Sequence, residues 1–201
     1  MRHEKDLIEI ANMLDGFHAS FSRLCEQQSI ITKSYNRLAE LWSDKVYSIT
    51  GECLTEVSLA ADRVYAEFSD MARRLGQEHS RLCDYQEIDE ARSYPELEFP
   101  KDILWEDNGV NNGRIRVDPE DIKQFEVSLA GYLDEISRVE QDIAAKYAEA
   151  ADFWRDEQYG RFGDAVTEFT SGISRETEKL STLALLLARK REILEKEVGS
   201  I

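Results

Sequence analysis

The sequence predicts an all-α protein, in which two long αα-hairpins form an elongated, coiled-coil-like four-helix bundle and an irregular connector joins them. Three observations predict this class. The three prolines all lie between residues 95 and 119, and the residues outside that window are mostly good helix formers. Apolar residues recur at helical spacing on both sides of the window. We expect the first hairpin in residues 1–85, the connector in residues 86–117 and the second hairpin in residues 118–201.

The first helix is predicted by a stripe of apolar residues spaced three, four or seven apart, in which Gln28 fills the one missing step. The stripe consists of Phe17, Phe21, Leu24, Ile31, Tyr35, Leu38 and Trp42. A second stripe predicts the second helix and runs over Val46, Ile49, Cys53, Val57, Ala61, Val64, Phe68, Met71 and Leu75.

The second half repeats this pattern 112 residues later, with Glu140 at the polar step. Asp44 and Tyr47 likewise match Asp156 and Tyr159. We interpret the pattern as an internal duplication that supplies the second hairpin in the same chain. The shifted first stripe is Leu129, Leu133, Ile136, Ile143, Tyr147, Ala150 and Trp154, and the stripe after it is Phe162, Val166, Phe169, Ile173, Leu180, Leu183 and Leu187.

Each Trp-x-Asp is predicted to be the closed corner of a hairpin. Asp44 and Asp156 are good N-caps, because their side chains can accept a bond from an N–H group two or three residues on. Each tryptophan would plug its corner, with Tyr47 and Tyr159 close by. Two alternatives stay open. Each block could be one uninterrupted helix of about 80 residues, roughly 120 Å long, or the tryptophans could anchor a partner at exposed hairpin tips.

The connector is rich in turn formers such as "DNGVNNG", and its end is a helix start. Asp118 is placed as the N-cap, and Pro119 stands at the first helical position, where its missing N–H costs nothing. Within the connector, Trp105 belongs to the apolar run "DILW". It either packs onto the bundle or forms a short docking site for a partner.

A leucine-rich segment, "LSTLALLLARK" at residues 180–190, is apolar on more than one helical face, so one seam of the core cannot cover it. Either the connector or another chain is expected to lie over it. The predicted partner contacts are therefore Leu183, Leu186 and Leu187, together with Trp105.

Composition restricts the classes of partner. The chain has 201 residues, 42% of them hydrophobic, which is enough to build a core. Its 41 acidic and 25 basic residues give a formal charge of -16. This charge repels phosphate backbones and anionic lipids, so we expect no nucleic-acid partner, and the expected partners are proteins.

The cysteines and the N-terminus indicate a compartment. Cys25, Cys53 and Cys83 are odd in number, have no CxxC spacing and lie within apolar runs, which is typical of a reducing compartment. The start "MRHEKDLIEI" is charged from its second residue, and no stretch approaches the ~18 apolar residues of a membrane span. We expect no membrane insertion and a cytoplasmic protein, or one exported without a cleavable signal peptide.

Motifs for catalysis or metal binding are not recognisable in the sequence. None of His3, His18 and His79 has a glutamate three residues earlier, as a di-iron bundle requires. No Cys/His cluster has metal spacing, and no Gly-rich phosphate loop or supported nucleophile stands out. We expect no enzyme activity, no cofactor and no metal.

The segment "RIRVDPEDIKQFEVSLAGYL" followed by "YAEAADFWRDEQYGRF" resembles the WXG100, or ESAT-6-like, superfamily, whose members are helical hairpins with a Trp-x-Gly turn and are secreted by type VII systems. The resemblance covers residues 115–197 directly and residues 7–85 through the repeat. The chain differs in having Trp-x-Asp in place of Trp-x-Gly and in being a tandem. The resemblance implies a duplicated member of the superfamily.

In that family a Tyr-x3-Asp/Glu signal just after the second helix directs secretion. Tyr85 and Asp89 have this spacing near the corresponding position of the first half, and Tyr94 and Glu98 also fit. The resemblance makes Tyr85 and Asp89 a candidate export signal, with a chance match as the alternative.

These observations predict a non-enzymatic helical interaction protein that binds helical protein partners through exposed helix seams. The resemblance implies a role as adaptor, chaperone or secreted partner in a type VII-like or contact-dependent bacterial system. The alternative is a structural scaffold, in which a homodimeric or larger homo-oligomeric helical rod acts as a spacer within an assembly. An enzyme would require a pocket built by the connector.

Overall fold

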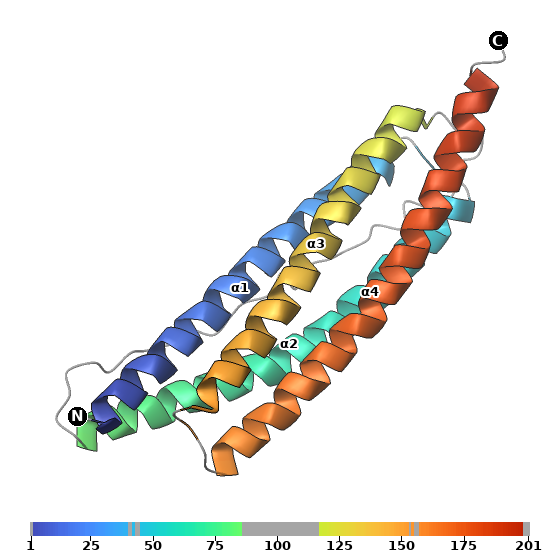
Figure 1. Ribbon diagram of the computed structural model, residues 1–201. Helices are drawn as coiled ribbons and strands as arrows, with labels where there is room; N and C mark the ends of the chain where they lie inside the picture. The colour runs from blue at the N-terminus through green and yellow to red at the C-terminus, as the bar shows by residue number, and fades with distance from the viewer. Residues whose placement is uncertain are drawn as a thin grey trace.

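The computed structural model describes residues 2–39, 42, 45–85, 117–152, 154 and 157–198. These residues form four helices, α1 (Arg2–Ala39), α2 (Lys45–Tyr85), α3 (Pro119–Ala150) and α4 (Glu157–Val198) (Figure 1). No strand occurs among them, so the predicted all-α class is confirmed. Of the predicted connector, only Val117 belongs to the described residues.

Each half of the chain is interrupted at its tryptophan. The interruption lies between α1 and α2 in the first half and between α3 and α4 in the second half. In both places the tryptophan N–H still donates to the carbonyl oxygen four residues earlier, from Trp42 to Leu38 over 2.8 Å and from Trp154 to Ala150 over 2.9 Å. The tryptophans themselves are not helical, and the helix after each of them packs back against the helix before it, so the alternative of one uninterrupted helix in each half is wrong.

The four helices lie side by side and give an elongated, bundle-like molecule (Figure 1). Helix α1 packs along α3, α2 along α4, and α3 along α4, whereas the contact between α1 and α2 is the least extensive of the four. Helices α1 and α3 are antiparallel, because Ser20 bonds to Asp142 and Ser34, further along α1, bonds to Ser128, which precedes Asp142 in α3. The two halves of one chain thus pack on each other.

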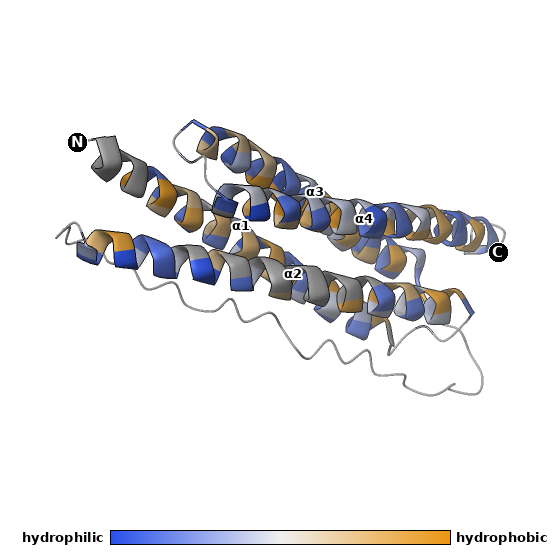
Figure 2. Cartoon of the chain, turned by 90° about the horizontal axis from the view of Figure 1, so that it is seen from below, coloured by the Kyte–Doolittle hydropathy of each residue, from blue (hydrophilic) through white to orange (hydrophobic). Residues whose placement is uncertain are grey.

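The core contains most of the predicted stripe residues of α1, α3 and α4 together with residues outside the stripes, such as Leu14, Ile122 and Phe125. Apolar residues show as orange faces along helices whose other faces are blue (Figure 2). Two aromatic pairs cross from α1 to α4, Phe17 with Phe162 and Phe21 with Phe169, both with ring centroids 5.5 Å apart. Burying one large apolar side chain contributes about 1.5–3 kcal/mol, so these pairs hold the two halves together. The core also contains Leu24, Ile31, Tyr35 and Leu38 of α1 and Leu129, Ile136, Ile143 and Ala150 of α3.

The stripe predicted for α2 is described only in part. Leu54, one position from the predicted Cys53, is buried, and Val46 and Cys53 pack against the core. Ile49 is exposed. The side chains of the other predicted members lie outside the described part of the structure, namely Val57, Ala61, Val64, Phe68, Met71 and Leu75.

Helix α3 begins as the sequence predicts. The Asp118 side chain accepts a hydrogen bond of 2.9 Å from the backbone N–H of Glu120, and Pro119 occupies the first helical position. Glu120 and Asp121 lie in the first turn, where the helix dipole favours negative charge. Val117 is buried just before the cap, so the start of the helix is held by both a polar and an apolar contact.

Candidate functional site

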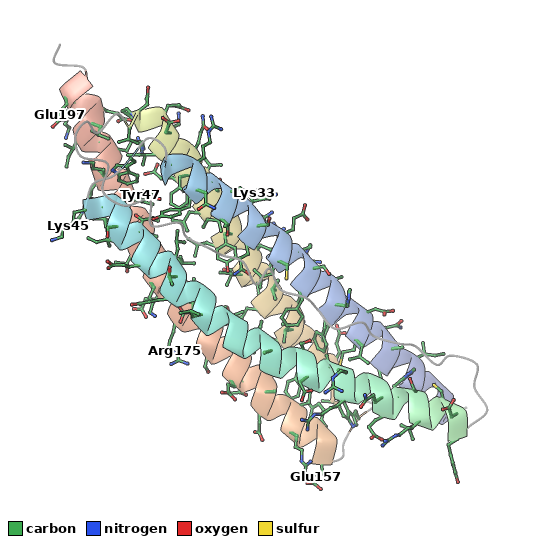
Figure 3. The ribbon with its side chains drawn as sticks, turned by 180° about the vertical axis from the view of Figure 1, so that it is seen from behind. Lys33, Lys45, Tyr47, Glu157, Arg175 and Glu197 are labelled. Carbon is green, nitrogen blue, oxygen red and sulfur yellow. The ribbon has the colours of Figure 1, made fainter. Side chains whose placement is uncertain are left out.

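The first corner, between α1 and α2, is built around Trp42, whose side chain is 1% exposed. The rings of Tyr35 and Tyr47 stack with centroids 4.8 Å apart and planes 4° apart, and Trp42 lies 5.8 Å from Tyr47. The Tyr35 hydroxyl donates to the backbone carbonyl oxygen of Tyr47 over 3.3 Å. Figure 3 shows Tyr47 at this corner, close to Lys45, where α2 begins.

The second corner, between α3 and α4, lies at the other end of the molecule, where Glu157 is labelled in Figure 3. Tyr147 and Tyr159 stack at 4.7 Å and 7°, and Trp154 lies 5.8 Å from Tyr159. The hydrogen bond is reversed relative to the first corner, because here the Tyr159 hydroxyl donates to the Tyr147 carbonyl oxygen over 3.3 Å. The pKa of Tyr147 is raised, first by hydrogen bonding with Tyr159 and then by burial.

Two glycines make room for the tyrosines, and the sequence reasoning missed them. A Cβ on Gly51 would lie 2.3 Å from Tyr35 Oη, and a Cβ on Gly163 would lie 2.2 Å from Tyr147 Oη. Both distances are far below van der Waals contact, so a side chain at either position would displace a ring. The signal was available, because these two glycines are also 112 residues apart.

The burial of the tryptophans decides between two of the alternatives. Trp42 and Trp154 belong to the core, with exposed fractions of 1% and 9%, so their packing role is confirmed and a role as exposed partner anchors is wrong. Tyr47 and Tyr159 are half-buried and pack against the same core. The capping residues Asp44 and Asp156 lie outside the described residues, so their capping role stays a prediction.

The leucine segment of α4 requires a correction. Leu183 and Leu187 lie in the chain's own core and are not accessible to a partner, so the prediction that they form a contact surface is wrong. The physical reason is that α4 packs against both α2 and α3, which together cover two faces of the helix. Leu186 is half-buried, and its neighbour Leu185, which was not among the predicted contacts, is 65% exposed.

Near its C-terminal end, the outer surface of α4 carries apolar side chains among charged ones. Leu186 and Ile193 are seven residues apart and so share one helical face, and Ile193 is exposed. The positions 112 residues before Leu185 and Leu186 carry Arg73 and Arg74 instead. We call Leu185, Leu186 and Ile193 the α4 patch.

The arginines at the matching place on α2 are engaged by their own helix. Arg73 and Arg74 both form ion pairs with Asp70, the latter at 2.7 Å. The hydrogen bond from Arg73 is the first cause of an Asp70 pKa below its ordinary value. This part of α2 therefore presents a paired charged cluster, where α4 presents leucines.

The remaining predicted contacts lie at the end of the first hairpin or beyond it. Tyr85, the last residue of α2, is 88% exposed. Asp89, its proposed partner in an export signal, and Trp105 both lie outside the described residues. The structure thus leaves the export signal and the Trp105 docking site as predictions.

An ion-pair network joins α1 to α3 and was not foreseen. Arg23 Nε lies 2.8 Å from Glu135 Oε1, and Arg23 Nη2 lies 2.8 Å from Asp142 Oδ2. Arg138 holds the second oxygen of Glu135 at 3.1 Å, and the buried Ser20 hydroxyl donates to Asp142 over 3.1 Å. The hydrogen bond with Glu135 is the largest cause of a raised Arg23 pKa, so this guanidinium stays charged.

The described residues offer little for catalysis or metal chemistry. Among them, no group of three or more His, Cys, Asp or Glu side chains converges as a metal site would need. The Cys83 sulfur lies 3.8 Å from both ring nitrogens of the buried His79. The pKa of the Cys53 thiol is raised, chiefly by burial, which favours its neutral form.

Within the described helices, none has a stretch apolar enough over sufficient length to span a bilayer. Comparison with known proteins adds no assignment, because no family model, no curated protein and no solved structure matches the chain.

Proposed function

We propose that this chain is a non-enzymatic interaction protein that binds a helical protein partner through the α4 patch. The observation that carries the proposal is the exposure of Leu185 and Ile193, at 65% and 53%, beside the half-buried Leu186 on one stretch of α4. Large apolar side chains grouped on a helix surface are typical of a seam that another helix covers.

The charges around the patch indicate what the partner would carry. Although the chain as a whole is strongly acidic, the stretch between Leu186 and Ile193 contains Arg189, Lys190 and Arg191 and one acidic residue, Glu192. Basic residues at the rim of an apolar patch favour a partner with an acidic rim, since complementary charge speeds association and orients the complex. We therefore propose a partner helix with an apolar stripe flanked by acidic residues.

The biological setting we propose is that of an adaptor, chaperone or secreted partner in a type VII-like or contact-dependent bacterial system. It rests on the resemblance to WXG100-like hairpins and on the matched corners, in which residues 112 apart make the same aromatic stacks. We propose that these matched corners stem from a duplicated hairpin. The protein would act in the cytoplasm or leave it without a cleavable signal peptide.

The test is a comparison of partner recovery from the organism that makes the protein. A tagged parent chain, the double variant Leu185→Glu/Ile193→Glu and the control Val127→Glu would be purified under the same conditions. Val127 is an exposed apolar residue on α3, so its variant carries a new surface charge outside the patch. A partner that is retained by the parent and the control but lost by the double variant supports the proposal. Equal recovery by all three would refute it.

A structural scaffold is the second candidate, and the length of the helices favours it. Helix α4 spans 42 residues, which corresponds to roughly 63 Å at 1.5 Å per residue. A homodimer joined through the α4 patch would be a longer rod that serves as a spacer. Light scattering of the purified chain separates the two candidates, because a parent dimer that becomes monomeric in Leu185→Glu/Ile193→Glu supports the scaffold, whereas a monomeric parent excludes it.

A further inference from the structure

Helices α1 and α3 pose a recognition problem, because they carry the same apolar pattern. The buried stripe of each has the same spacing over residues that are 112 apart, with large residues at nearly every shared position. The hydrophobic effect is non-directional and depends on the area removed from water. The apolar stripes alone would therefore allow α1 to pair with a second α1, or α3 with a second α3, as well as with each other.

The observed pairing places equivalent positions against each other at its centre. Because α1 and α3 are antiparallel, the bonds Ser20 to Asp142 and Ser34 to Ser128 flank the contact between Arg23 and Glu135. Glu135 is the residue 112 positions after Arg23. In an antiparallel pair of two identical helices with this register, position 23 would therefore face a second position 23, and position 135 a second position 135.

The charges at this centre are opposite in the two helices. Helix α1 carries Arg23 and Glu26, and the equivalent residues of α3 are Glu135 and Arg138, so both signs are reversed. The Glu135 side chain is only 7% exposed and is held at 2.8 Å by Arg23 and at 3.1 Å by Arg138. Two α3 helices would bring two such buried carboxylates together, each paired only with the Arg138 of its own helix, and like charges facing each other at a buried position are unfavourable.

A pair of two α1 helices would lose the ion pairs of Arg23 and would also bring two arginine side chains together. Arg23 would meet a second guanidinium where it now meets Glu135. The second acceptor of Arg23 is Asp142, at 2.8 Å, and the equivalent residue of α1 is Ile30. Neither of the two carboxylates that Arg23 now contacts would be present, and the second α1 would offer only Glu26, at the position where α3 carries Arg138.

We propose that Arg23 and Glu135, supported by Asp142, form a heterotypic lock, which makes α1 accept α3 and reject another α1, and makes α3 reject another α3. A buried polar pair that selects partner and register at a helix interface has this role in coiled coils. In the folded chain the lock directs the first hairpin onto the second hairpin of the same molecule. It acts independently of the α4 patch, which lies on a different helix.

The lock is tested within one chain by reversing its charges. In a background with Asp142→Asn, one variant carries Arg23→Glu/Glu26→Arg, a second carries Glu135→Arg/Arg138→Glu, and a third carries all four changes. The Arg23 side chain is 41% exposed although Glu135 is buried, so each single-helix reversal should lower the thermal midpoint by roughly 2–10 °C. The combined reversal should restore most of that loss. Unchanged midpoints, or a combined variant no more stable than the single-helix reversals, would overturn the proposal.

Selectivity, as distinct from stability, is tested by co-expressing the two single-helix reversals with different tags. Within each variant chain, α1 and α3 carry mismatched charges. In a dimer in which the first hairpin of each chain packs on the second hairpin of the other, both α1 to α3 interfaces have complementary charges. We expect a 1:1 mixed dimer in large excess over either self-pair. A statistical mixture of mixed and self-pairs, or no mixed species, would contradict the lock.

A matched control is present inside the second hairpin. Arg191 Nε lies 2.9 Å from Glu126 Oε2, and both side chains are mostly buried. This pair joins the beginning of α3 to the end of α4, at the open end of the second hairpin, so a swap of whole hairpins leaves both partners in the same chain. Co-expressed Arg191→Glu and Glu126→Arg chains should form no mixed dimer, and enrichment of one would show that charge reversal alone drives association, which would overturn the proposed selectivity.

Discussion

The two corners reach the same aromatic geometry with different neighbours. Stacked tyrosines lie 4.8 Å apart in one and 4.7 Å in the other, and the tryptophan lies 5.8 Å from its tyrosine in both. In the second corner Phe162 adds a ring 5.9 Å from Trp154. The matching position of the first corner is Thr50, whose hydroxyl donates to the Val46 carbonyl oxygen of its own helix.

This difference shows which features define the corner. The features common to both are the tryptophan, the two tyrosines and the glycine beneath one of them, whereas the residue at position 50 or 162 varies between threonine and phenylalanine. The hydrogen bond between the tyrosines also runs in opposite directions. Ring stacking and close packing are therefore the shared basis, and the direction of the hydrogen bond adapts to it.

The largest effect is expected from removing the corner tryptophans. Trp42→Ala and Trp154→Ala should each lower the free energy of unfolding by about 3–5 kcal/mol, since each leaves a large cavity in the core. Trp42 should cost more, because it is 1% exposed and Trp154 is 9% exposed. Urea denaturation measures both, with Tyr85→Ala at an exposed site as the control. Losses no larger than that of the control would mean that the corners do not stabilise the fold.

The next effect concerns the glycines and tests whether the two corners are equally tight. Gly51→Ala and Gly163→Ala should each cost about 1–2 kcal/mol, because over-packing a tyrosine ring outweighs the gain in helix propensity. A Cβ on Gly160 would meet nothing within 4 Å, so Gly160→Ala should instead stabilise α4 by up to about 1 kcal/mol. Thermal unfolding of the three variants gives the comparison, and stabilisation by all three would contradict it.

Gln28 and Glu140 are the matching polar residues within the apolar stripes of α1 and α3, and their surroundings differ. Gln28 is buried, and within the described residues its amide nitrogen and oxygen have no hydrogen-bond partner. Glu140 at the matching position is half-buried and accepts a bond of 3.1 Å from Ser174. Gln28→Leu should therefore stabilise the protein by about 1–2 kcal/mol, while Glu140→Leu should change stability by less than about 0.5 kcal/mol. Calorimetry measures both changes. If Gln28 were a required polar contact, the Gln28→Leu variant would be less stable than the Glu140→Leu variant.

The smallest effect is a pH dependence that belongs to the first half alone. The pKa of Asp70 is lowered in the folded protein, first by the hydrogen bond from Arg73. The ionised carboxylate therefore stabilises the fold at a pH above the pKa of the unfolded chain, about 3.9. This stabilisation is lost as the pH falls through the lower pKa of the folded protein. The group is partly exposed, so the contribution is about 0.5 kcal/mol. Asp70→Asn should thus be less stable than the parent at pH 7 and equal to it well below pH 3. A constant difference across this range would contradict the assignment.

The parts of the fold that were predicted correctly are those governed by neighbouring residues. The Asp118 cap, the helix start at Pro119 and the interruptions at Trp42 and Trp154 each depend on a few adjacent residues. The burial of the first-helix stripes follows from their spacing in a helix. The face of α4 was predicted less well, since its leucines cover several faces and only the packing of α2 and α3 decides which of them are buried.

By itself, the sequence determined the all-α class, the helix start at Pro119 and the apolar stripes, because periodicity and capping are local physics. Tertiary structure alone decided that Leu183 is buried and Leu185 exposed, and that Arg23 meets Glu135. These contacts depend on the relative position and rotation of helices far apart in the chain, which local spacing does not encode. The matching glycines lie between the two cases, since the shared offset is visible in the sequence, but the tyrosine ring above each glycine is a tertiary contact.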